Sequence, residues 1–152
     1  MSIVIVDTGV ANLASVRFAF DRLGITSVIS DEANVITSAD RVLIPGVGAA
    51  PFAMQKINQK GLTPILKSLS QPVMGICLGM QLIFETLEEG GKPIKGLGLV
   101  PGTVSTLDTR GQPSPIWDGI RYTVLKMTPY CQASMIMITL ISFIALPRRC
   151  QT

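Results

Sequence analysis

The sequence predicts an α/β protein with an open, mostly parallel sheet and flanking helices. Between residues 2 and 104, short β-branched apolar runs alternate with segments whose apolar residues recur at helical spacing. Strands that alternate with helices in this way pair in parallel. Turn-forming or glycine-containing segments follow three of the predicted strands, and ligands bind open parallel sheets where the strands end. A length of 152 residues suits one domain with a sizeable core.

The first predicted strand, residues 2–6, is a β-branched apolar run of the kind that is buried on both faces of a sheet. A turn at residues 7–9 follows it. Apolar side chains recur at helical spacing over residues 12–23, and Gly24 is expected to end this helix. Two further strands are predicted at residues 27–30 and 41–44.

The next part of the chain is predicted to continue the alternation. The expected order is helix, helix, strand, helix, at residues 49–57, 63–69, 72–76 and 80–87. Residues 97–104 are typical of a strand and a turn. After Ser114 the alternation disappears.

The composition excludes several classes of function. A net charge of +3 without a basic run does not indicate nucleic-acid binding. Cys77, Cys131 and Cys150 have neither metal-ligand nor secreted-disulfide spacing, and nothing in the sequence suggests a metal or an organic cofactor. The apolar run at residues 3–6 is too short for a signal peptide, and residues 130–146 fall short of the roughly 20 apolar residues that span a bilayer. We therefore expect a cytoplasmic protein without a membrane anchor.

Cys77 is the best candidate for chemistry because it stands between a predicted strand and a predicted helix, close to two glycines. A sharp turn there would project its thiol from the sheet edge, and the helix N-terminus would favour the thiolate, the nucleophilic form. The alternative is a small buried apolar residue, the common fate of a free cysteine. The chain contains no histidine, the base that a cysteine nucleophile usually needs.

The run PGVG at residues 45–48 could act only through its backbone. Glycines allow close approach to a ligand, and inward N–H groups could stabilise an oxyanion together with the N–H of Leu78. A plain turn is the alternative. Gln81, one helical turn after Cys77, could hold a polar substrate or be a solvated helix residue.

Three runs of residues resemble those of a known family. The run GICLGMQ at residues 75–81 resembles the nucleophile elbow of class I, triad-type glutamine amidotransferases. The runs DTGVANLASV at 7–16 and PGVGA at 45–49 are similar to those of the glutaminase subunits of imidazole glycerol phosphate synthases, from histidine biosynthesis. Other branches of the class usually carry a second glycine in place of Val47. The resemblance covers about residues 1–115.

The resemblance implies a Cys-His-Glu triad that hydrolyses glutamine to glutamate and ammonia. Cys77 would form the glutamyl thioester, and the backbone at Val47, Gly48 and Leu78 would hold the oxyanion. Gly48 and Gln81 would help to bind glutamine. The family passes its ammonia to a cyclase subunit, which forms imidazole glycerol phosphate and AICAR, so a heterodimer with this partner is implied. No cofactor or metal is implied.

The triad histidine and glutamate lie beyond the last matching residue, and the genetic code suggests why. Family members carry Pro-His-Met-Gly-Trp-Asn where this chain has residues 115–120. When the third base of each codon is read with the first two bases of the next, Trp117 and Asp118 force a glycine codon. The neighbouring shifted codons can spell the remaining family residues. Met135 and Met137, each followed by isoleucine, likewise give aspartate codons in that frame.

We therefore interpret residues 1–115 as the N-terminal portion of an amidotransferase domain and residues 116–152 as an out-of-frame tail. The C-terminal part of the fold is then missing or aberrant, and the 152-residue chain is expected to fold poorly and to lack glutaminase activity. Two alternatives stay open: a non-catalytic truncated interaction protein, and an amidotransferase for anthranilate, guanylate or pyridoxal phosphate synthesis. A flavodoxin-like nucleotide binder is disfavoured because no phosphate-cradling glycine loop follows the first strand.

Overall fold

A computed structural model describes residues 1–105 of the chain. The predicted tail at residues 116–152 and the boundary at 115 lie outside this range, as do the apolar segment 130–146 and two of the three cysteines. The described strands are β1 (Ile3–Val6), β2 (Val28–Ser30), β3 (Arg41–Gly46), β4 (Val73–Cys77), β5 (Phe84–Glu89), β6 (Lys92–Lys95) and β7 (Val100–Val104). The helices are α1 (Leu13–Arg22), α2 (Ala33–Thr37), α3 (Ala50–Gln59), α4 (Leu62–Lys67) and α5 (Leu78–Leu82).

The main sheet is four-stranded, entirely parallel, and ordered β2-β1-β3-β4. Val4 on β1 pairs with Val28 on one side and with Val42 on the other. At the other end of the sheet, Gly46 on β3 pairs with Cys77 on β4. The parallel α/β architecture expected from the sequence is therefore confirmed, and the carboxyl ends of β1, β3 and β4 share one edge.

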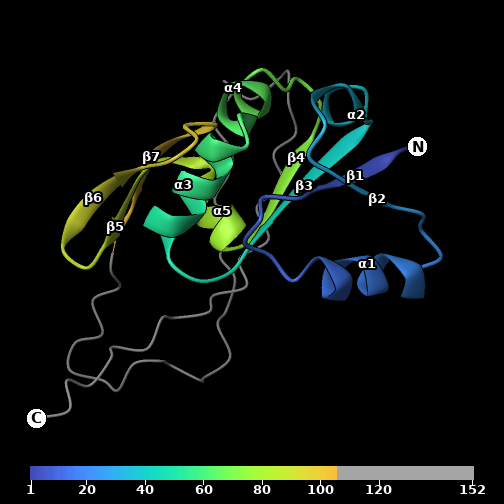
Figure 1. Cartoon of the computed structure of the whole chain (residues 1–152), viewed down its shortest axis with the longest axis horizontal. Helices are drawn as coiled ribbons and strands as arrows, with labels where there is room; N and C mark the ends of the chain where they lie inside the picture. Colours follow the sequence, from blue (N-terminus) through green and yellow to red (C-terminus); the bar gives the residue numbers. More distant parts are fainter. Residues whose placement is uncertain (106–152) are drawn as a thin grey trace, which may run out of the picture.

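Helices α3, α4 and α5 cover one face of this sheet, and α1 lies on the other side (Figure 1). The covered face contributes alternate strand residues to the core, such as Val4, Val6 and Ile44. Apolar helix residues pack against them, among them Ile57, Leu66 and Leu82, all fully buried. This packing is the main source of stability, since each fully buried aliphatic side chain contributes roughly 1.5–3 kcal/mol.

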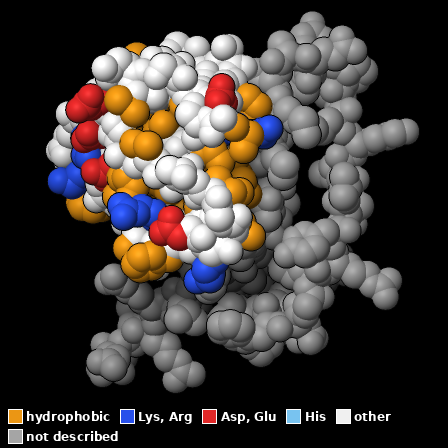
Figure 2. Space-filling model, turned by 90° about the vertical axis from the view of Figure 1, so that its right-hand side faces the viewer, with side chains coloured by type: hydrophobic (Ala, Val, Ile, Leu, Met, Phe, Trp, Pro, Cys, Tyr) orange, Lys and Arg blue, Asp and Glu red, His pale blue; other side chains and the backbone are white. Residues whose placement is uncertain are grey.

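Helix α1 follows its sequence pattern but buries little. Asn12 caps it, its Oδ1 accepting from the backbone N–H of Ser15 at 3.2 Å, and the chain turns at Gly24 with a φ of 68°. None of its residues is buried, and Phe18 and Leu23 are 59% and 72% exposed. The face seen in Figure 2 accordingly mixes hydrophobic side chains with charged ones.

The predicted helix over residues 80–87 is wrong, because α5 ends at Leu82 and Phe84 begins β5. Backbone N–H groups of residues 97–99 donate to the carbonyl groups that would accept hydrogen bonds within a longer helix. The N–H of Leu97 donates to the carbonyl of Leu82 at 2.7 Å, and that of Leu99 to the carbonyl of Ile83 at 2.8 Å. The apolar stretch suited either structure, and tertiary hydrogen bonds decided between them.

Strand β5 joins β6 and β7 in a separate three-stranded sheet, ordered β6-β5-β7. It is antiparallel to β6 and parallel to β7. Gly90 and Gly91, both with positive φ, form the turn between β5 and β6. This hairpin and the short helix α2 were not expected from the sequence, although paired glycines are a known hairpin signal. Within residues 1–105, no helix is long and apolar enough to cross a membrane.

Candidate functional site

Cys77 lies where the sequence predicted a sharp turn. It is the last residue of β4 and the N-cap of α5, with φ 54° and ψ −123°. Among residues 1–105 it is the one non-glycine residue with a positive φ. Such a backbone costs about 1–3 kcal/mol and persists where the surroundings impose it, typically at functional sites. The thiol is free and half-buried.

Nearby glycines allow this turn to form against the sheet. A Cβ added to Gly79 would overlap the carbonyl oxygen of Ile44 on β3, and one added to Gly75 would lie 2.6 Å from the backbone nitrogen of Met80. Neither position therefore has room for a side chain. The glycines are therefore required so that α5 can begin directly over the ends of β3 and β4.

The PGVG run lies beside Cys77, as expected. Pro45 and Gly46 end β3, and a Cβ on Gly46 would lie 2.7 Å from the backbone nitrogen of Gly79. Gly48 has a φ of 87°, a conformation that favours glycine. Residues 45–48, named the oxyanion loop after the role expected for them, are therefore in close contact with the start of α5 at Gly46.

The backbone N–H groups that are expected to stabilise the oxyanion differ in whether they already have a hydrogen-bond partner. The backbone N–H of Val47 donates to the carbonyl oxygen of Val10 at 2.8 Å, so it can serve an oxyanion only after that bond breaks. Leu78 is the first residue of α5, where backbone N–H groups have no partner within the helix. Gln81 lies half-buried on the same helix, one turn after Cys77.

Sequence reasoning missed an ionic cluster at the ends of β1 and β2. The ammonium Nζ of Lys60 donates to the carboxylate Oδ2 of Asp7 at 2.9 Å, to its carbonyl oxygen at 3.0 Å and to Oδ2 of Asp31 at 2.8 Å. The hydrogen bond from Lys60 holds the pKa of Asp31 below its ordinary value. The bond to Asp31 in turn raises the pKa of Lys60, against the opposing effect of burial.

Sequence reasoning also missed Glu89, at the end of β5. Its Oε2 accepts a hydrogen bond from the backbone N–H of Ala50, the first residue of α3, at 2.7 Å. The N-cap residue Ala49 has no side chain that could do this, and a negative charge at a helix N-terminus is favourable. Glu89 therefore fixes the start of α3, just after the oxyanion loop. Because a helix was expected up to residue 87, the sequence did not place Glu89 at the end of a strand beside α3.

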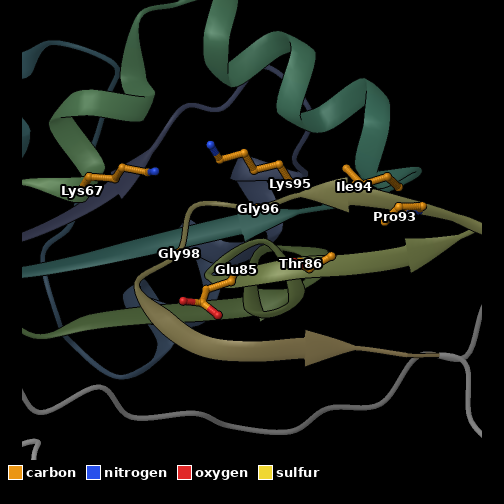
Figure 3. Close-up of a pocket in the computed structure, with 8 residues that line it drawn as sticks. All are labelled: Lys67, Glu85, Thr86, Pro93, Ile94, Lys95, Gly96 and Gly98. Atoms are coloured by element: carbon orange, nitrogen blue, oxygen red, sulfur yellow. The ribbon is translucent and has the colours of Figure 1, made fainter.

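A depression of about 660 Å³ lies on the smaller sheet, away from Cys77. In Figure 3 the side chains of Lys67 and Lys95 extend toward one another, while Glu85 lies on a neighbouring strand. The lining residues include none of the oxyanion loop or of α5; they are Lys67, Glu85, Thr86, Pro93, Ile94, Lys95, Gly96 and Gly98. In the described part of the chain, no group of three or more His, Cys, Asp or Glu residues could hold a metal ion.

Comparison with known proteins gives consistent matches. The profile of the family described as "Glutamine amidotransferase class-I" matches residues 4–133. The chain is 44% identical over 129 residues to the imidazole glycerol phosphate synthase subunit HisH of Haemophilus influenzae, covering 85% of this chain and 64% of the relative. The HisH subunit of Idiomarina loihiensis is 50% identical and that of Yersinia pestis 47%, each over 115 residues, 76% of this chain and 58% of the relative. The chain thus spans about three fifths of the length of these relatives.

Proposed function

The chain belongs to the class-I glutamine amidotransferase family, and on that premise we propose that its gene encodes the glutaminase subunit of an imidazole glycerol phosphate synthase. The observation that carries this proposal is the strained Cys77 at the β4–α5 junction, beside the oxyanion loop. The identity of 44–50% to HisH subunits supports the choice of pathway.

The proposed reaction begins with attack of the Cys77 sulfur on the side-chain amide carbon of glutamine. A C–S bond forms, the C–N bond breaks, and the nitrogen leaves as ammonia with the proton of the thiol. Water then cleaves the thioester, which releases glutamate and restores the thiol. The N–H groups of Leu78 and Gly48 would stabilise the oxyanion, joined by Val47 once its bond to Val10 opens, and Gly48 with Gln81 would hold glutamine.

The proton transfers need a base, and the 152 residues contain no histidine. We attribute this to the reading-frame shift at about residue 115, so residues 116–152 are a proposed out-of-frame tail. Without the base and its orienting carboxylate, the 152-residue chain has no measurable glutaminase activity in this proposal. A protein with the frame restored would be active.

The remaining parts of the proposal concern the partner. The ammonia passes to a cyclase subunit, which forms imidazole glycerol phosphate and AICAR in the cytoplasm, within a heterodimer. The relatives' names support this, since each is described as a synthase subunit. The absence of histidine favours one other candidate for the chain as printed, a non-catalytic subunit that still contacts the cyclase.

The site is tested by labelling with a chloromethyl ketone derived from glutamine, which alkylates a thiol that lies beside bound glutamine. In the frame-restored protein we expect one label on Cys77, found by peptide mass mapping, and protection by added glutamine. Iodoacetamide serves as the matched reagent without a glutamine group, and at equal concentration it should label Cys77 more slowly than the chloromethyl ketone does. Labelling by the chloromethyl ketone that added glutamine does not slow, or labelling of another residue, would refute the proposed site.

A further inference from the structure

We propose that Lys60 is a positioning residue for the oxyanion loop and that it acts through residues 7–10. The functional meaning of this inference rests on the proposed glutaminase, since the role of residues 45–48 belongs to that proposal. The structural link itself stands on hydrogen bonds between three segments that are distant in the sequence.

Lys60 follows the last residue of α3 and reaches back over the ends of β1 and β2. An ammonium group has three N–H donors, and here three oxygens of Asp7 and Asp31 accept, at 2.8–3.0 Å. Hydrogen bonds to an ionised partner are about twice as strong as neutral ones. The side chain of Lys60 is only 28% exposed, so the cluster is partly shielded from water and salt.

The cluster fixes the conformation of residues 7–10. While Oδ2 of Asp7 binds Lys60, its Oδ1 accepts from the backbone N–H of Gly9 at 2.9 Å and closes a tight turn. Gly9 has a φ of 78°, and a Cβ there would lie 3.5 Å from Cε of Lys60. The lysine stem therefore packs against the turn that its ammonium group holds.

Residues 7–10 in turn hold the oxyanion loop. The carbonyl of Val10 accepts from the backbone N–H of Val47 at 2.8 Å. The hydroxyl of Thr8, which is fully buried, donates to the carbonyl of Pro45 at 3.5 Å. The direction of the Val47 peptide, and with it the set of N–H groups available to an oxyanion, therefore depends on where Lys60 holds residues 7–10.

The competing explanation is an ordinary ion pair that only secures the end of α3. Exposed pairs of that kind contribute about 0–1 kcal/mol to global stability and affect every protected amide alike. A positioning role instead predicts a local effect at Val47 that the centre of the sheet does not share.

The test is backbone amide hydrogen exchange, measured residue by residue by NMR on the frame-restored protein, since the 152-residue chain is expected to fold poorly. In Lys60→Met, which keeps the stem and removes the ammonium, we expect the Val47 amide to exchange roughly tenfold faster, equivalent to about 1.4 kcal/mol. The amide of Ile44, in the centre of β3, should keep its rate. Lys60→Arg should restore protection of Val47, and Lys67→Met, an exposed lysine of α4, is the matched control without effect.

Two results would overturn the inference: unchanged exchange at Val47 in Lys60→Met, or an increase that Ile44 shows equally. Asp31→Asn removes one exposed partner of Lys60 and is the second variant, for which we expect a smaller, still local increase at Val47. If Lys60→Met does not fold, the absence of that increase in Asp31→Asn refutes the inference. Exchange does not depend on glutamine hydrolysis, so the failure of the proposed function and the failure of this link give separate results.

Discussion

At the scale of the residue, the site depends on backbone that only a few residue types allow. Cys77 occupies a conformation with positive φ, and glycines on both sides give α5 room to begin over the sheet. The position of this turn was predictable from the sequence, since an apolar run leads into it and glycines flank it. The space requirement of each glycine was not, because it arises from backbone atoms of β3 and α5.

Gly79→Ala should destabilise the fold by about 3 kcal/mol, because its Cβ would overlap the carbonyl oxygen of Ile44. Gly90→Ala is the control: no atom lies within 4 Å of the added Cβ, and only a backbone penalty of about 1–2 kcal/mol applies. Urea unfolding followed by circular dichroism measures both. Equal losses for the two variants would show that β3 and α5 are not in the close contact described.

The contribution of the Asp31–Lys60 bond should depend on pH in a defined direction. The pKa of Asp31 is lowered in the folded protein from its ordinary value of 3.8, so the stabilisation is fully present above 3.8 and is lost as the pH falls through the folded value. The urea midpoint of the frame-restored protein should therefore exceed that of its Asp31→Asn variant at neutral pH and converge with it in strong acid. A difference that persists at pH values well below 3.8 contradicts the assignment.

At the scale of the element, local pattern and tertiary contact compete. The strand–helix alternation from β1 to α5 followed from apolar spacing, and the expected strands agree with the structure within about two residues. After α5 the pattern was ambiguous, and hydrogen bonds from residues 96–99 decided for a strand. The roles of Lys60 and Glu89 could not be predicted from local pattern either. Lys60 binds Asp7, 53 residues away in the sequence, and Glu89 binds Ala50, 39 residues away.

Glu89→Ala should weaken the start of α3 by about 1 kcal/mol, since Ala50 loses the acceptor of its backbone N–H. We expect faster hydrogen exchange at Ala50 and a small drop in the urea midpoint. Glu88→Ala, the neighbouring exposed carboxylate on β5, is the control and should change neither quantity. An unchanged exchange rate of the Ala50 amide in Glu89→Ala would show that Glu89 does not stabilise the start of α3.

At the scale of the whole molecule, residues 1–105 form a four-stranded parallel sheet and a smaller three-stranded sheet, with the strained turn at Cys77 at the end of β4. Helices α2 to α5 bury one side of the main sheet, whereas α1 on the other side buries none of its residues. Sequence reasoning recovered this architecture and the neighbourhood of Cys77, because both follow from local spacing and glycine placement. It could not predict the hydrogen bonds between residues 7–10 and residues 45–48, or those of Lys60.

The proposed frame shift makes a prediction about the gene itself. For the shifted frame to spell the family residues after residue 114, the codons must be CCC for Pro115, ATA for Ile116, GAT for Asp118 and GGA for Gly119. Sequencing the gene across this region measures them directly. An ATT or ATC codon at Ile116 would exclude the shifted methionine and, with it, this explanation of the missing histidine.

The central claim is that Cys77 is the nucleophile of a glutaminase whose base the 152-residue chain lacks. The most direct measurement is glutamate release from glutamine, with the cyclase present, by three proteins: the 152-residue chain, the frame-restored protein and its Cys77→Ser variant. We predict release by the frame-restored protein alone. Glutamate released by the 152-residue chain, or undiminished release after Cys77→Ser, would contradict the claim.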